Sequence, residues 1–235
     1  MNRIPPEGLK VAVTRPVKDF ADTADALREI GADPISVPAI EIDVTPREDL
    51  VKALRNPADF NWILFTSRNA VDAVFAVVDS ISGPRIAAVG PRTADALTAH
   101  GAAIDLVPEV HTAQGLLGVL PNVAGEKVLL PESELALPTL RDGLVERGAH
   151  VTTVTAYLTR ELRVNLHHLE RIDIVLFSSP SAVDSIVNSG GVPENTQVVC
   201  VGPTTTAAAK RQGLRVHATA RDHTAGSLAK ALSDV

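Results

Sequence analysis

Ser, Thr, Gly and Pro cluster where the predicted strands of this chain give way to helices. The segments are Thr66-Ser67-Arg68-Asn69, Gly90-Pro91-Arg92-Thr93, Ser178-Ser179-Pro180-Ser181 and Gly202-Pro203-Thr204-Thr205. Such residues cap helices, because they satisfy backbone N–H groups that the first turn leaves unpaired, and proline suits the first helical position. The same N–H groups and the positive end of the helix dipole can bind an anion. Capping alone explains any single residue, whereas several such helix starts at one sheet edge favour a site for an anionic ligand.

Arginines stand at three strand ends and would add local positive charge. They are Arg15, Arg68 and Arg92. Arg15 follows a predicted strand directly, so we expect it to contribute most. A solvated loop arginine is the alternative interpretation, because exposed ion pairs contribute little.

Tyr157 is the only tyrosine, and it stands in the segment Thr155-Ala156-Tyr157-Leu158-Thr159. As an aromatic residue it could fill an interface between domains. As a phenol it could instead donate a proton to a leaving group. The residue type alone leaves both interpretations open.

Other chemical signals are weak. No His, Cys, Asp and Glu set has metal-ligand spacing, and the chain has no GxGxxG, Walker or GxSxG motif. Cys200 lies in an apolar stretch, which predicts an inert core residue. His111 and His223 each precede a threonine that can cap a helix, so we expect both in loops. We therefore expect no metal and no nucleotide cofactor.

Composition narrows the class of protein. The 235 residues are 45% hydrophobic but only 3% aromatic, which suits buried parallel strands of Val, Ile, Leu and Ala. One cysteine excludes an internal disulfide, and no leader or transmembrane run is evident. The formal net charge is −6, which disfavours nucleic acid or an anionic membrane as a partner. We expect a cytoplasmic protein that is monomeric, because no long exposed apolar stretch requires a partner.

The elements that position these residues read as alternating strands and helices. Glycines at positions 31, 101, 148 and 213 follow helical stretches, as left-handed C-terminal caps do. The alternation predicts parallel sheets with right-handed crossovers, and ligands then bind beyond the carboxyl ends of the strands. The ten expected strands are Val11–Thr14, Ile35–Val37, Ile63–Thr66, Ile86–Val89, Ile104–Val107, Val128–Leu130, Val151–Val154, Ile174–Phe177, Val198–Val201 and Arg215–Ala218.

The chain also repeats itself. Three pairs of motifs are each 112 residues apart: LFTSRNAV and LFSSPSAV, AVGPRTA and CVGPTTT, and HTAQGLL and HTAGSLA. A shorter block repeats at an offset of 117, with Gly31 matching Gly148. The order is therefore short, long, short, long, which predicts two five-stranded α/β sheets. The blocks could pair sequentially, or the first and last could enclose the middle two. Two extended segments, 39–44 and 154–161, read as linker strands and favour the nested arrangement.

At this point the chain resembles the uroporphyrinogen-III synthase family. The resemblance extends from VTRP near the start through LFTSRNAV, AVGPRTA, VTAYLT, LFSSPSAV and VGPTTTAA to HTAGSLAKAL. It implies two flavodoxin-like, doubly wound parallel-sheet domains joined by a two-stranded linker. Residues 1–38 and 162–235 would form a discontinuous domain, residues 45–153 an inserted domain, and residues 39–44 and 154–161 the linker.

The resemblance also implies a reaction. The linear polycarboxylate tetrapyrrole hydroxymethylbilane would lose its hydroxyl group, form a spiro intermediate and close to uroporphyrinogen III with ring D inverted, without a cofactor. Because hydroxymethylbilane also closes unaided without inversion, two hinged lobes that clamp the substrate would matter more than strong acids and bases.

Residue roles follow from the same resemblance. Tyr157 matches the linker tyrosine that assists departure of the hydroxyl group, and we predict it as the catalytic residue. One departure from the family pattern is Gln197, where a lysine is sometimes found. The predicted substrate-binding residues are Arg15, Thr66, Ser67, Arg68, Thr93, Ser178, Ser179, Gly202, Thr204 and Thr205. A non-catalytic tetrapyrrole or small-molecule binding protein with two hinged lobes is the alternative function.

Overall fold

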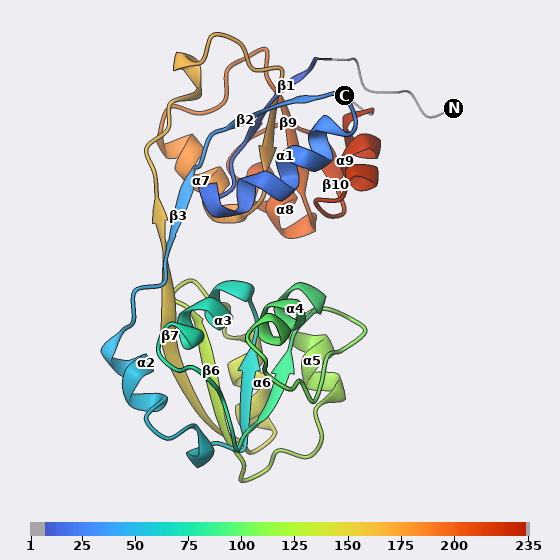
Figure 1. The fold of residues 1–235 in the computed structure, drawn as a ribbon. Helices are drawn as coiled ribbons and strands as arrows, with labels where there is room; N and C mark the ends of the chain where they lie inside the picture. Colours follow the sequence, from blue (N-terminus) through green and yellow to red (C-terminus); the bar gives the residue numbers. More distant parts are fainter. Residues whose placement is uncertain (1–7, 234–235) are drawn as a thin grey trace. The chain divides into compact units, whose positions relative to one another are not determined.

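The computed structural model describes residues 8–233 and divides the chain into two compact units (Figure 1). Unit 1 contains the chain up to Glu41 and from Arg160 onward, and unit 2 contains Ile42–Thr159. The backbone therefore passes twice from one unit to the other. Both units are α/β structures with parallel strands, which confirms the α/β, parallel-sheet part of the predicted fold class.

Unit 1 is built on a five-stranded sheet in the order β10-β9-β8-β1-β2. The strands are β1 (Lys10–Val13), β2 (Asp33–Ser36), β8 (Ile174–Phe177), β9 (Gln197–Val201) and β10 (Val216–Ala220), and every pairing is parallel. Side chains alternate between the two faces of the sheet. One face packs on α1 (Phe20–Arg28) and α9 (Ala225–Leu232). The other face packs on α7 (Pro180–Asn188) and α8 (Pro203–Arg211). Two short 3₁₀ turns, Val17–Asp19 and Leu166–His168, complete the unit.

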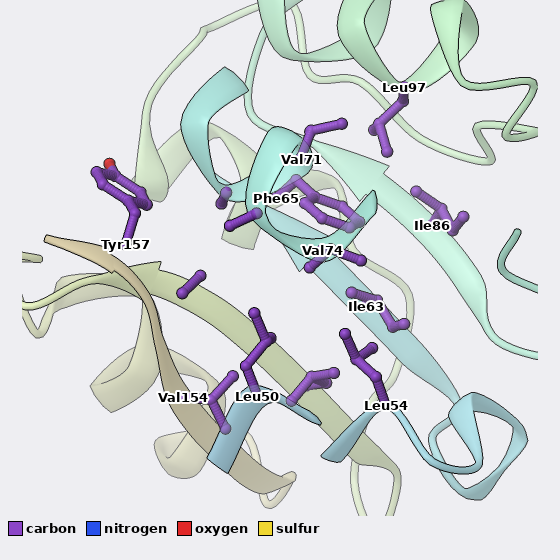
Figure 2. Packing of buried hydrophobic residues seen from close by; sticks show 14 of the residues in the cluster. Leu50, Leu54, Ile63, Phe65, Val71, Val74, Ile86, Leu97, Val154 and Tyr157 are labelled. Atoms are coloured by element: carbon purple, nitrogen blue, oxygen red, sulfur yellow. The ribbon is translucent and has the colours of Figure 1, made fainter. Parts of the chain in front are cut away.

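Unit 2 is built on a second sheet, in the order β3-β7-β6-β4-β5. Its strands are β3 (Ile40–Asp43), β4 (Trp62–Phe65), β5 (Arg85–Ala88), β6 (Lys127–Ser133) and β7 (His150–Glu161). Ile63 and Phe65 face a cluster with α2 (Glu48–Ala53), α3 (Arg68–Phe75) and α4 (Pro91–Ala99), which Figure 2 shows in part. Trp62 and Leu64 face α5 (Ala113–Val119) and α6 (Thr139–Glu146) on the other side. A 3₁₀ turn, Pro57–Asp59, precedes β4.

One predicted strand is wrong. The segment Ile104–Val107 forms only an isolated bridge, between Leu106 and Ala87. The Asp105 carboxylate takes the N–H of Ile86 at 2.7 Å, and Pro108 has no N–H with which to extend the ladder. The fifth strand of the second sheet is β3, from the segment interpreted as a linker.

Several local predictions are confirmed. The glycines at positions 31, 101, 148 and 213 all have positive φ, between 74° and 80°, a conformation that glycine adopts without the steric cost of a Cβ atom. Cys200 is fully buried in β9, and burial raises the pKa of its thiol to about 11. No helix in the described part of the chain is both long and apolar enough to cross a membrane.

Candidate functional site

Ser67 links the end of β4 to the start of α3. It follows the fully buried Phe65 and the half-buried Thr66. Its backbone is extended, with φ −152° and ψ 152°, and its side chain caps α3 by accepting the N–H of Ala70 at 3.1 Å. The helix then buries Ala70, Val71 and Val74 against the sheet. Cap and apolar stripe together fix the Ser67 hydroxyl at the carboxyl edge of the sheet.

The same hydroxyl reaches Tyr157. Ser67 Oγ donates its hydrogen to the phenol oxygen of Tyr157, with 3.1 Å between the two oxygens. The Tyr157 side chain is only 9% exposed and lies at the margin of the apolar cluster. Figure 2 shows its oxygen directed away from the packed side chains. Because Ser67 supplies the hydrogen of this bond, the hydrogen of the phenol itself can be donated to a third group.

A shift in strand register aims Tyr157 at Ser67. Glu132 pairs with Thr155 in the β6–β7 ladder, but the next residue, Ser133, pairs with Tyr157. Ala156 is thus the additional residue of a β-bulge. In a regular strand Ala156 and Tyr157 would point to opposite faces, yet both belong to the same apolar cluster. Bulges of this kind re-aim side chains next to functional sites.

The second helix start of unit 2 follows β5. Gly90 is the N-cap of α4 and provides no side-chain hydrogen bond. Thr93, in the first turn, is 5% exposed, while Arg92 is on the surface. A Cβ atom at Gly90 would lie 3.2 Å from Cβ of His111, so the glycine allows the loop before α5 to approach closely. Arg68, the first residue of α3, is exposed and has an interaction partner.

Glu132 is a functional candidate to which the sequence analysis gave no role. It is partly buried near the carboxyl end of β6. Desolvation by burial raises the pKa of its carboxyl group, and the nearby charge of Arg141 opposes this rise. The sequence signal was a single acid directly after the apolar stretch of a strand, which is easily read as a loop residue.

Unit 1 repeats the helix starts at the carboxyl edge of its own sheet. Ser179 caps α7 by accepting the N–H of Ala182 at 3.2 Å, and its Oγ lies 3.1 Å from that of Ser181. Ser178 Oγ is buried and has no hydrogen-bond partner in the structure. A buried hydroxyl without a partner carries a desolvation cost, and a bound ligand would relieve it.

The start of α8 completes this edge. Gly202 is its N-cap, with φ +79° and no side-chain bond. Thr204 is exposed and Thr205 is 3% exposed. Arg15 follows β1 and donates from Nη1 to the Thr23 hydroxyl of α1 at 2.8 Å. The guanidinium is therefore held against α1 as well as standing at the predicted edge.

The predicted residues fall into two groups, one in each unit. Among the described residues, Ser67 and Tyr157 are predicted site residues that a side-chain hydrogen bond joins directly. No group of three or more His, Cys, Asp and Glu side chains in the described chain is placed to bind a metal ion. The structure thus places the buried phenol of Tyr157 against the helix-capping hydroxyl of Ser67. It also places the N-termini of several helices at the carboxyl edge of each sheet.

Comparison with known proteins identifies the family of the chain. The family described as "Uroporphyrinogen-III synthase HemD" matches residues 21–230. The chain belongs to the uroporphyrinogen-III synthase family. A putative uroporphyrinogen-III synthase of Methanothermobacter thermautotrophicus is 30% identical, over 87% of this chain and 90% of the relative. The porphyrin biosynthesis protein HemD of Ruminiclostridium josui is also 30% identical over 88% of this chain, which spans only 45% of that relative's length.

Solved structures show the same fold. A mutant uroporphyrinogen III synthase of Thermus thermophilus has a TM-score of 0.65 at 21% identity, and the match covers 94% of this chain and 96% of that one. The uroporphyrinogen-III synthetase of Helicobacter pylori has a TM-score of 0.66 at 16% identity, with 93% and 95% covered. The family membership predicted from the motifs is confirmed.

Proposed function

We propose that this chain catalyses the reaction of its family, the closure of hydroxymethylbilane to uroporphyrinogen III with inversion of ring D and loss of water. The observation that carries the proposal is the hydrogen bond from Ser67 to Tyr157 at the carboxyl edge of the unit 2 sheet. It supports a phenol that is oriented, mostly buried and able to donate its own hydrogen. This is what departure of a hydroxyl group requires.

Tyr157 would donate its proton to the hydroxyl group of the substrate. The carbon–oxygen bond breaks, water leaves and the end of the tetrapyrrole becomes a protonated azafulvene cation. The Ser67 hydroxyl stabilises the negative charge that develops on the phenol oxygen. The substituted carbon of ring D then attacks to form the spiro intermediate, which fragments and recloses. The proton lost on final closure restores the phenol, so no cofactor is needed.

The helix starts would bind the carboxylates of the substrate. Those of α3 and α4 contain Thr66, Ser67, Arg68 and Thr93, and those of α7 and α8 contain Ser178, Ser179, Gly202, Thr204 and Thr205. Backbone N–H groups and helix dipoles bind anions without an overall basic surface. In this way a protein of net charge −6 could still bind a substrate that carries many negative charges. Arg15 would add one positive charge.

The finer organisation is part of the same proposal. The order β2-β1-β8-β9-β10 of unit 1 follows the flavodoxin-like pattern 2-1-3-4-5. In unit 2, β5-β4-β6-β7 follows the first four positions of that pattern, and β3, which comes first along the chain, occupies the remaining edge. We take the two units to be the discontinuous and inserted domains, with residues 39–44 and 154–161 as linkers. We take the protein to act as a cytoplasmic monomer.

An isomer assay tests the proposal. Purified protein is supplied with hydroxymethylbilane, the product is oxidised, and the uroporphyrin isomers are separated. We expect type III from the wild type and a kcat roughly 10- to 100-fold lower for Tyr157→Phe. Formation of the type I isomer alone by the wild type would mean spontaneous closure and refute catalysis. An unchanged kcat in Tyr157→Phe would remove Tyr157 from the mechanism.

A further inference from the structure

Exposed apolar side chains concentrate in the segments that follow strand ends. Eight large hydrophobic side chains are exposed in the described chain. Five of them follow strands or the Leu106 bridge, and only three lie on helices away from these segments. The five are Val17, Val107, Val110, Leu135 and Leu137, and the three are Val51, Val119 and Val145. In each unit, exposed apolar side chains thus stand in segments that follow the carboxyl ends of the strands, and four of the five are in unit 2.

The strongest case is the segment between β6 and α6, residues 134–138, which we call the lip. Leu135 is 61% exposed and Leu137 is 76% exposed. The lip is nevertheless held by hydrogen bonds. Ser133 accepts the N–H of Leu135 on its Oγ at 3.1 Å and that of Ala136 on its carbonyl at 3.0 Å. Two large apolar side chains thus extend into water from this segment, and the free energy that their burial would provide is not gained.

The lip is also tied to the strand that carries Tyr157. Glu134 accepts the backbone N–H of Thr159 on Oε1 at 2.6 Å and the Ser133 hydroxyl on Oε2 at 2.8 Å. Ser133 itself pairs with Tyr157 in the ladder. The two leucines therefore extend from an anchor that stands beside the phenol and within the same unit.

We infer that Leu135 and Leu137 pack against the pyrrole rings of the tetrapyrrole whose hydroxyl group Tyr157 protonates. The inference rests on the proposed function. In that proposal the helix starts bind the carboxylates of the substrate, and the lip would be a separate surface that binds its rings. Pyrroles present flat apolar faces and carry their carboxylates at the rim. The lip matches this chemistry, because α6 begins directly after it at Thr139 and its N-cap Pro138 provides no side-chain bond. The two apolar side chains thus directly precede a helix start, whose first-turn N–H groups can bind a carboxylate.

The test is a paired comparison in the full-length protein. The lip variant carries Leu135→Ser and Leu137→Ser. The control variant carries Val119→Ser and Val145→Ser, which are 49% and 56% exposed on α5 and α6 of the same unit. For each protein we measure kcat and KM with hydroxymethylbilane, and the oligomeric state by sedimentation velocity. We expect the lip variant to raise KM about tenfold, since each lost apolar contact is worth a factor of about three, and the control to match the wild type.

Three results would overturn the inference. One is a KM in the lip variant equal to that of the wild type, and another is an equal rise in the control variant. The third is a wild type that self-associates through the lip, shown by dissociation in the lip variant alone, because a second copy would then cover the leucines. A wild type that forms only the type I isomer overturns the proposed function itself, whereas type III formation with unchanged KM overturns only the role of the lip.

Discussion

The hydroxyl of Ser67 has two tasks, and Ser67→Ala removes both. It caps α3 through the N–H of Ala70 and supports the phenol of Tyr157, each at 3.1 Å. Loss of an N-cap costs about 1 kcal/mol, and loss of a hydrogen bond between partly buried groups costs about 1 kcal/mol more. We expect Ser67→Ala to lower the free energy of unfolding by about 2 kcal/mol.

Thr112→Ala is the matched control for stability. Thr112 caps α5 of the same unit by accepting the N–H of Gly115 at 3.0 Å, and the one tyrosine of the chain bonds to Ser67 instead. It should lose only the cap, about 1 kcal/mol. Urea unfolding of both variants therefore isolates the contribution of the bond to Tyr157 as the difference between them.

A double-mutant cycle on kcat separates the catalytic task. If Ser67 acts on the reaction through Tyr157, then Ser67→Ala lowers kcat in the wild type but has no further effect in Tyr157→Phe. Type III uroporphyrin formed from saturating hydroxymethylbilane gives kcat for all four proteins. Equal reductions in the two backgrounds would show that Ser67 acts independently, and would refute the assignment of Ser67 as a positioning residue for the phenol.

Three further predictions concern other parts of the two edges. Gly202→Ala should lower the free energy of unfolding by about 1 kcal/mol, because φ is +79° there. Thermal unfolding of Gly226→Ala is the comparison, because Gly226 lies in α9 and a Cβ atom there would meet nothing within 4 Å; an equal loss in both variants would contradict the backbone explanation. Glu132→Gln should raise the free energy of unfolding at about pH 7 but not at about pH 4. Because the pKa of Glu132 is raised in the folded state, the wild type loses stability as the pH rises through that pKa, and glutamine avoids this loss. Urea unfolding at both pH values checks this, and a larger gain at about pH 4 than at about pH 7 would contradict it. Arg15→Ala should weaken binding of uroporphyrinogen III roughly threefold to tenfold in an anaerobic titration, and equal affinity would reject its role with carboxylates.

The internal repeat is the part of the sequence that predicts structure most directly. Ser67 and Ser179, 112 residues apart, both cap helices, and so do Thr112 and Thr224. The repeat fails at the counterpart of β10, which forms a single bridge. Pro108 stands where β10 has Ala220, which pairs with Val201. One missing N–H thus ended a strand that periodicity alone predicts.

The pairing of Ser67 with Tyr157 lay beyond sequence reasoning. Both residues were candidates, but they are 90 positions apart and their contact depends on the bulge at Ala156. A bulge has no reliable sequence signature here, since regular alternation would have turned Tyr157 to the other face. The raised pKa of Glu132 was equally hidden, because burial depends on tertiary packing and not on local composition.

Because the backbone passes twice between the units, the two sheets are completed at different times during synthesis on the ribosome. Unit 2 is one continuous stretch, Ile42–Thr159, so all of it emerges while most of unit 1 has not been translated. An interior strand of the other sheet, β1, lies between β2 and β8 and pairs Val11 with Ile174 of β8. During synthesis β1 can pair with β2 early, but its second partner, β8, is made only after the whole of unit 2. We expect nascent chains that end near Thr159 to contain a protease-resistant unit 2 behind an N-terminal segment still available to chaperones.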